Sequence, residues 1–146
     1  MALKSTMTSN RLASVAQFIG IDPRELENLF VCEEWSAELA TGLVWLGPQA
    51  ASLHGTASTP CGIMDLIHLY DPADWQKVLQ ALEDAATAST TFSFSTTIRP
   101  GPGLHRPVFC FGQSETIDGS DGTIHGTFAI ARVCMETVPD RRGRLN

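Results

Sequence analysis

Charged residues are scarce in this chain. Asp, Glu, Lys and Arg make up only 18% of its 146 residues, against about a quarter in an ordinary soluble domain. Basic residues are the scarcer kind, 10 against 16 acidic ones, and the net charge is −6. Proteins that bind nucleic acid need a basic stripe or patch, so this balance argues against that class. A surface with so few charges is compatible with a partner interface.

The basic residues that do cluster lie near the C-terminus, at Arg141, Arg142 and Arg144. A run of this kind is more typical of a solvated tail than of a phosphate-binding helix. We therefore expect residues 138–146 to form a basic C-terminal tail.

Cysteine and long apolar runs are also sparse. The four cysteines, Cys32, Cys61, Cys110 and Cys134, include no Cys-x-x-Cys pair, and no His pair stands at metal-ligand spacing, which argues against a metal site. The first eleven residues lack the apolar core of a signal peptide. No stretch approaches the run of about 18 apolar residues that a membrane span requires. We expect a cytoplasmic protein with reduced, partly buried thiols and no membrane insertion.

The length and the 43% hydrophobic content fit one globular domain. Residues 1–32 are predicted to form an N-terminal helical extension after a disordered start at 1–7. Residues 33–137 form the main domain, and the tail follows it. The extension is expected either to pack into the core or to provide a dimer or partner surface.

Two helices are predicted in the extension. The first begins at Thr8 or Ser9 and ends at Gly20, and its apolar positions follow helical spacing at Leu12, Val15, Ala16 and Ile19. The second has a cap at Asp22, Pro23 in its first turn, and Glu25 three residues after the cap. Its predicted apolar face consists of Leu26, Leu29 and Phe30.

The best-defined stretch of the main domain is residues 63–86. It contains a short apolar turn and a polar break, followed by a helix capped by Asp74. The predicted buried stripe of that helix is Trp75, Val78, Leu79, Leu82, Ala85 and Ala86. Upstream we predict a hairpin over 35–45 with its turn at 40–42, a helical turn at 48–53 and a polar loop at 56–61.

Three strands are predicted downstream, over 91–99, 104–117 and 123–137, with turns at 100–103 and 118–122. The first alternates, with Phe92, Phe94, Thr96 and Ile98 on one face. Gly112 is expected to mark a bulge or bend in the second. The apolar centre of the third, residues 128–133, favours a position in the middle of the sheet. The predicted fold is α+β: a five-stranded antiparallel sheet with helices on one face.

Several motifs in this order resemble those of the PAS sensor domain of bacterial signalling proteins. Trp35, Thr41-Gly42 and Trp45 match the two aromatic residues and the turn of that family's first hairpin. Leu53-His54-Gly55 matches the Leu-x-Gly that ends its next short helix. The run from His68 to Asp74 resembles, with expanded spacing, the His-Pro-x-Asp motif before its long helix.

Later motifs extend the resemblance over residues 33–134. The hairpin with Arg99, a turn at 101–103 and Arg106 resembles the family's Arg-turn-Arg hairpin, and Gly122 and Gly126 match its Gly-x-x-x-Gly signature.

The sequence departs from the PAS motifs at two places. Pro107 stands where the family commonly has an aromatic residue, and Ala131-Arg132-Val133 replaces its Asp-x-Thr. No coiled coil, kinase or cyclase follows Arg132. If the chain is complete, we expect it to act on another protein.

The resemblance implies a non-enzymatic signal-transduction module that binds and modulates a partner protein. The expected partner is a sensor histidine kinase or another PAS-containing regulator, and a homodimer is expected through the N-terminal helices or the open sheet face. A second hypothesis is a module whose pocket senses a small molecule. The third is a small α+β enzyme resembling an isomerase.

An apolar pocket between the long helix and the sheet is the candidate ligand site. Its candidate lining residues are Trp75, Leu79, Phe92, Phe94, Phe109 and Phe111. We favour the alternative, a filled core made of the same residues. We predict no bound cofactor, with a small apolar ligand or haem as alternatives. PAS relatives that bind haem make His68 a candidate ligand, although no His lies within the long helix.

Flavin photochemistry and catalysis have weaker signals. The photosensing relatives need a Cys within an Asn-Cys-Arg-Phe-like run, whereas Cys61 lies in Thr-Pro-Cys-Gly-Ile. The enzyme hypothesis rests on His68 with Asp65, Asp71 and Asp74, the one local group of a His and carboxylates. Aspartates at the start of a helix are commonly caps, so we predict no catalytic residues and no metal site.

Overall fold

The computed structural model describes residues 12–56, 59–99, 102–103, 105–117 and 121–133. The predicted disordered start, the basic tail and Cys134 lie outside these residues, as do residues 100–101 and 118–120 of the two predicted turns. Within the described part of the chain, every helix is too short or too polar to cross a membrane.

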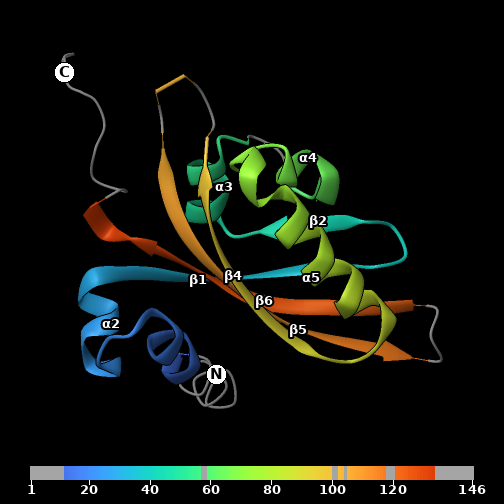
Figure 1. Cartoon of the computed structure of the whole chain (residues 1–146), viewed down its shortest axis with the longest axis horizontal. Helices are drawn as coiled ribbons and strands as arrows, with labels where there is room; N and C mark the ends of the chain where they lie inside the picture. The colour runs from blue at the N-terminus through green and yellow to red at the C-terminus, as the bar shows by residue number, and fades with distance from the viewer. Residues whose placement is uncertain (1–11, 57–58, 100–101, 104, 118–120, 134–146) are drawn as a thin grey trace.

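A twisted antiparallel sheet forms the centre of the molecule (Figure 1). Its spatial order is β3-β2-β1-β6-β5-β4, so the first and last long strands meet in the middle. The strands are β1 (Phe30–Glu38), β2 (Leu43–Leu46), β3 (Cys61–Gly62), β4 (Thr91–Ile98), β5 (Arg106–Ile117) and β6 (Asp121–Ala131). The α+β class is confirmed, and the apolar β6 lies between β1 and β5, as predicted.

The prediction of five strands is wrong, because the described residues form six. The additional strand β3 pairs with Leu43 and Val44 of β2. It lies at the end of the predicted polar loop, where the Thr59 hydroxyl accepts a hydrogen bond of 3.1 Å from the Leu46 amide. Two residues are too few to show the alternation by which a strand is predicted.

The helices are residues 12–19, α2 (Pro23–Leu29), α3 (Pro48–His54), α4 (Ile63–Ile67), the 3₁₀ turn η1 (Pro72–Asp74) and α5 (Trp75–Thr87). The residues predicted to end the first helix and to begin the second are confirmed. Gly20 has a φ of 92° and its amide donates to the Ala16 carbonyl, and the Asp22 carboxylate accepts from the Arg24 amide. Phe30 is not part of the α2 face, because the chain becomes extended there and β1 begins.

Helix α5 departs from the prediction at three positions. Asp74 precedes the helix, but its carboxylate makes no capping bond and accepts instead from the Thr96 hydroxyl at 2.7 Å. Ala86 is exposed, whereas Val78 and Ala85 are buried. Ala81, assigned to neither face, takes part in the packing instead.

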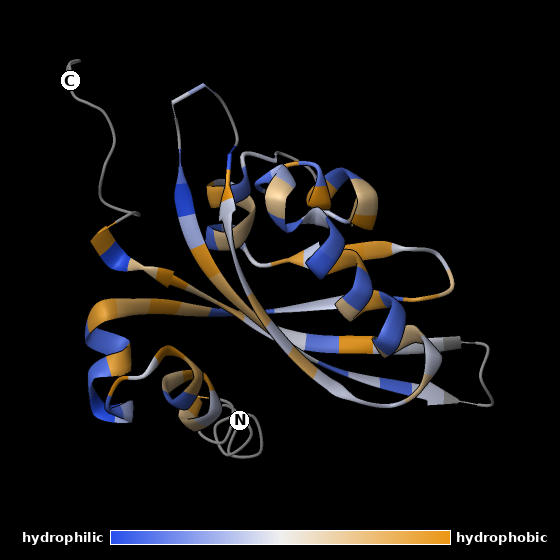
Figure 2. Ribbon diagram, in the orientation of Figure 1, coloured by the Kyte–Doolittle hydropathy of each residue, from blue (hydrophilic) through white to orange (hydrophobic). Residues whose placement is uncertain are grey.

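The helices cover both faces of the sheet rather than one. Helices α3, α4 and α5 pack over the main core, which includes Phe94, Cys110 and Phe128. Residues 12–19 and α2 pack on the opposite face around Val15, Leu26 and Ala129. Figure 2 shows hydrophobic residues along the start of β1 and in the helices beside it. The helical extension thus covers the part of the second face that surrounds this cluster.

Strands β5 and β6 differ from the prediction in detail. Gly112 makes no bulge, since it pairs in regular register with Phe92 and with Gly126. A Cβ there would collide with the Phe92 ring, so the glycine makes room for that side chain. Strand β6 ends at Ala131 rather than Thr137, because residues 132–133 are helical. Residues 134–137 lie outside the described part of the chain.

Gly126 gives a test of the packing at the middle of the sheet. An added Cβ would overlap the Phe111 carbonyl and the Trp35 indole, and neither is a flexible side-chain end. Gly126→Ala should therefore lower the unfolding free energy by at least about 2 kcal/mol in urea denaturation. Gly62→Ala, whose Cβ would meet only the Asp65 carboxylate, should cost at most about 1 kcal/mol. Equal costs for the two variants would contradict this packing.

Candidate functional site

The six predicted pocket residues do not form one site. Trp75, Leu79, Phe92 and Phe94 pack in the main core between α5 and the sheet. Phe109 and Phe111 belong to the cluster on the opposite face, against the N-terminal helices. The reason is the alternation of β5, in which Val108 and Cys110 point toward α5 and the two phenylalanines point away. The prediction that Phe109 and Phe111 line a pocket between α5 and the sheet is therefore wrong.

The cavity that lies between α5 and the sheet is small. Its volume is about 30 Å³, and its lining includes Trp35, Tyr70, Phe94 and Phe128. Sites for small-molecule ligands are typically about 300–1,000 Å³. A ligand of that size has to displace core side chains, so this geometry supports the filled core. The prediction of no bound cofactor stays a prediction, as do its alternatives, haem or a small apolar ligand.

Sequence reasoning missed a histidine that is fully buried in this core. His54, 0% exposed, holds the Ala50 carbonyl with Nδ1 at 2.7 Å and the Tyr70 hydroxyl with Nε2 at 3.1 Å. Burial lowers the pKa of His54 to about 4, opposed by its bond to the Ala50 carbonyl. The ring is therefore neutral near pH 7: Nδ1–H donates and Nε2 accepts from Tyr70. The spacing of Ala50, Leu53 and His54 matches an apolar helical stripe, a signal that places His54 inside.

The sheet holds the helix that carries His54. The Glu33 carboxylate, on β1, accepts from the Gln49 and Ala50 amides at the start of α3, at 3.2 and 2.5 Å. The Arg106 guanidinium, on β5, donates to the Leu53 carbonyl at the other end, at 2.8 Å. Helix α3 has no side-chain cap from its own N-cap residue, Gly47. Side chains from two strands thus supply its caps.

The described cysteines are poor nucleophiles. Burial raises the pKa of Cys32 to about 11 and that of Cys110 well above its usual value, although the Trp35 indole opposes the latter shift. The pKa of Cys61 is raised as well, chiefly by burial. These groups are thiols at neutral pH, so the geometry supports no activated cysteine.

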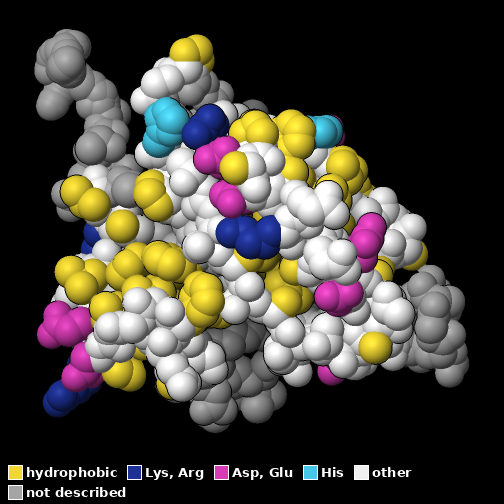
Figure 3. Space-filling model, viewed as in Figure 1, with side chains coloured by type: hydrophobic (Ala, Val, Ile, Leu, Met, Phe, Trp, Pro, Cys, Tyr) yellow, Lys and Arg dark blue, Asp and Glu magenta, His cyan; other side chains and the backbone are white. Residues whose placement is uncertain are grey.

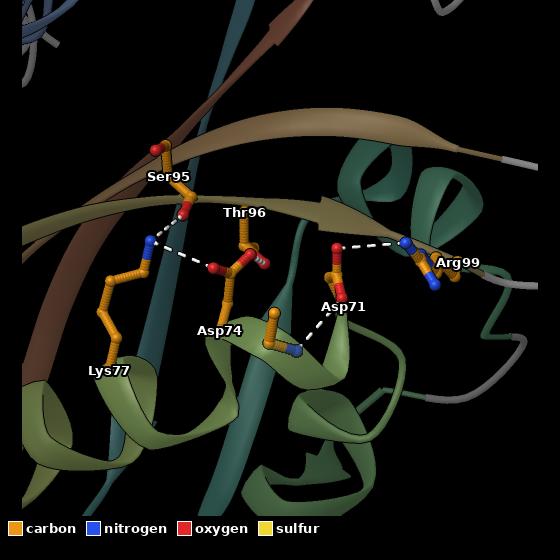
Figure 4. Close-up of polar contacts among 7 residues, drawn as sticks. Asp71, Asp74, Lys77, Ser95, Thr96 and Arg99 are labelled. Carbon is orange, nitrogen blue, oxygen red and sulfur yellow. Dashed lines mark hydrogen bonds and ion pairs between the residues drawn. The ribbon is translucent and has the colours of Figure 1, made fainter.

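The residues of the enzyme hypothesis are not assembled into an acid–base site. His68 is exposed and its ring lies against Trp75, 5.0 Å between centroids. Figure 4 shows Asp71 joined to Arg99, and Asp74 joined to Lys77 and Thr96. These carboxylates fasten the start of α5 to the edge strand β4. This arrangement gives the isomerase-like hypothesis no support, and His68 does not line the interior cavity.

No metal centre emerges among the residues that the structure describes, because no three His, Cys, Asp or Glu side chains converge there. The polar groups near α5 instead make structural bonds. Lys77 donates to the Ser95 carbonyl at 2.8 Å, and the Trp75 indole donates to the Tyr70 carbonyl at 2.9 Å.

The fold of the chain can be compared with those of solved structures. No protein-family model matches the chain and no curated protein matches it. The structure is similar to the N-terminal domain of a diguanylate cyclase with a PAS/PAC sensor from Marinobacter aquaeolei: the TM-score is 0.60 at 16% identity, over 73% of this chain and 98% of that one. The chain has a PAS fold.

Other PAS-like structures agree with this assignment. A sensory box histidine kinase/response regulator from Burkholderia thailandensis matches with a TM-score of 0.54 at 19% identity, over 68% of this chain and 76% of that one. An RNA-binding light-oxygen-voltage receptor matches with a TM-score of 0.57 at 9% identity, over 77% of this chain and 32% of that one. The resemblance to PAS domains inferred from the sequence is confirmed at the level of the fold.

The motifs that resemble PAS domains serve packing in this structure. Gly55 ends α3 with a φ of 75°. Gly122 and Gly126 make room for the backbone of β5, and Gly126 also for the Trp35 ring. Arg99 and Arg106 bind Asp71 and the Leu53 carbonyl. These residues position the helices of the PAS fold on its sheet.

Buried His54 gives this fold a specific pH dependence. Its pKa is lower in the folded protein, about 4, than in the unfolded chain, about 6.5. The unfolded state therefore takes up a proton first as the pH falls. The contribution of the neutral His54 to the unfolding free energy is therefore complete above about pH 6.5 and is lost toward pH 4. The total loss is roughly 3 kcal/mol.

Urea denaturation between pH 7 and pH 4 measures this effect, with His54→Leu as the reference. The unfolding free energy of the wild type minus that of the variant should fall steadily as the pH falls, because only the wild type has the buried imidazole. Parallel pH profiles for the two proteins would contradict the assignment of a neutral His54.

Proposed function

We propose that this protein is a signal-transduction module that binds and modulates a partner protein. The observation that carries the proposal is the match of its fold to almost the whole of a PAS/PAC sensor domain. Solved structures with this fold include a part of a diguanylate cyclase and of a histidine kinase/response regulator. A sensor histidine kinase or another PAS-containing regulator is the partner we propose.

The interior of the domain offers little room or reactivity for catalysis, which favours a function in which the protein surface binds a partner. The cavity under α5 has room for about one or two waters at its volume of about 30 Å³. The titratable groups near it are a neutral His54, the buried Tyr70 and the buried Cys110, and burial raises the pKa of the last two well above their usual values. None of these groups is placed to exchange protons with a substrate at neutral pH.

The surface we propose for the partner lies where α2 meets the end of β6. Leu29 is 49% exposed and Val133 is 67% exposed, and they flank the paired residues Phe30 and Ala131. Arg132 fastens this corner by donating to the Glu27 carbonyl at 2.8 Å. Figure 3 shows hydrophobic side chains gathered at the lower left, over the region of α2 and the start of β1. Exposed apolar patches of this kind are typical of protein interfaces.

We propose that the same corner forms a homodimer when no other partner is bound. Leu29→Glu should then shift the protein from dimer to monomer in analytical ultracentrifugation, because it places a charge in a desolvated contact. The loss expected for a buried, unpaired carboxylate is at least about tenfold in dimer affinity.

Met64→Glu is the matched control, since Met64 is 48% exposed and lies on α4, over the other face of the sheet. It should leave the dimer unchanged. If Leu29→Glu and the wild type sediment alike, this corner is not the homodimer contact. Capture of a purified sensor histidine kinase by the wild type, and not by Leu29→Glu, tests the partner.

A further inference from the structure

A large hollow lies on the sheet face opposite α5. It is an open groove of about 580 Å³ between the helix at 12–19 and strands β4, β5 and β6. Its lining includes Gln17, Phe18, Phe111, Gln113, His125 and Thr127. The volume falls within the range of about 300–1,000 Å³ typical of small-molecule sites. The interior cavity, at about 30 Å³, does not.

The groove lacks fixed charge. None of the described residues that line it is Asp, Glu, Lys or Arg, although the whole chain has a net charge of −6. Among the described lining residues, a phosphate or carboxylate would find no Lys or Arg, and a cation would find no carboxylate. The lining therefore matches an uncharged ligand.

Polar side chains line the groove without partners of their own. Within the described part of the chain, no hydrogen bond joins the side chains of Gln17, Gln113 or Thr127 to another protein group. Thr127 is the most telling, because it is only 3% exposed. Among the described residues, its hydroxyl is not one of the buried polar atoms that lack a partner, so it stays open to the groove and can exchange a water for a polar group of a ligand. A purely apolar ligand would leave these groups unpaired.

Aromatic rings supply the other part of the lining. Phe18 meets Phe111 edge to face, with 5.0 Å between ring centroids and 88° between planes. Phe18 is nonetheless 44% exposed, so part of its ring remains open to a ligand. A flat heterocycle can stack on such a ring while its edge bonds to neighbouring amides and hydroxyls.

We propose that this groove binds an uncharged, planar, hydrogen-bonding heterocycle of nucleobase size. The ring stacks on Phe18, and its polar edge meets Thr127 and the amide of Gln17 or Gln113, each of which offers a donor and an acceptor. The ligand then joins the N-terminal helix to the sheet. This site is separate from the interior cavity and from the corner at Leu29, so it does not depend on the proposed partner surface.

The test uses the full chain with adenosine and cytidine as uncharged probes and adenosine 5′-monophosphate as the charged one. Binding of at least one uncharged probe should saturate in isothermal titration calorimetry. In two-dimensional amide NMR, the shifts should concentrate at Phe18, Phe111 and Thr127, and not at the interior residues Val78 and Leu82. The monophosphate should bind no more tightly than adenosine, because the described lining residues offer its phosphate no Lys or Arg.

Single substitutions assign the contacts. Phe18→Ala should raise the dissociation constant at least about fivefold through lost stacking, and Thr127→Val should raise it about fivefold through a lost hydrogen bond. Met64→Ala, equally exposed on the other face, should have no effect. If Thr127→Val fails to fold, Gln113→Ala replaces it, with the exposed Gln76→Ala as its control.

Three outcomes would overturn the proposal. They are no saturable binding of either nucleoside, shifts confined to the interior lining, and affinities unchanged by both groove variants. Tighter binding of the monophosphate would overturn the uncharged class. Loss of the dimer in Leu29→Glu with nucleoside binding retained separates this proposal from the partner surface.

Discussion

Burial of both faces of the sheet is the constraint on which the rest of this structure depends. In β5, successive side chains point alternately to α5 and to the N-terminal helices, and both sets are apolar at 108–111. A strand of this kind is stable only when both of its faces are covered. Helix α5 and its neighbours cover one face, and residues 12–19 with α2 cover the other. The extension is thus a structural layer of the domain.

Helices and strands whose ends or periods are marked by neighbouring residues could be predicted from the sequence. Gly20, Asp22 and Pro23 mark helix ends through backbone geometry that depends on neighbouring residues alone, and the structure has those ends where predicted. The long helix and β4 show their periods over many residues, and both are present. The short strand β3 was missed because Cys61 and Gly62 gain strand character only from pairing with β2.

Assignments that depend on distant partners were harder. Phe109 and Phe111 alternate with Val108 and Cys110. Both faces of this part of β5 are therefore apolar, and the sequence pattern does not identify which face lies against α5. Sequence reasoning placed the phenylalanines against α5, and the structure places them on the other face. The groove brings together residues from 14 to 127, a separation that no local pattern encodes. His54 had a usable signal in its spacing from Ala50, whereas its bond to Tyr70 had none.

The way in which α3 is held has a consequence for the order of folding. An isolated helix of seven residues is unstable in water, since the cost of its first turn is never recovered. Its terminal bonds reach Glu33 and Arg106, which lie 17 residues from Ala50 and 53 from Leu53. The helix therefore acquires its stability only after β1 and β5 are in place. We expect α3 to form late, and its amides to exchange with solvent through local openings that leave the central strands paired.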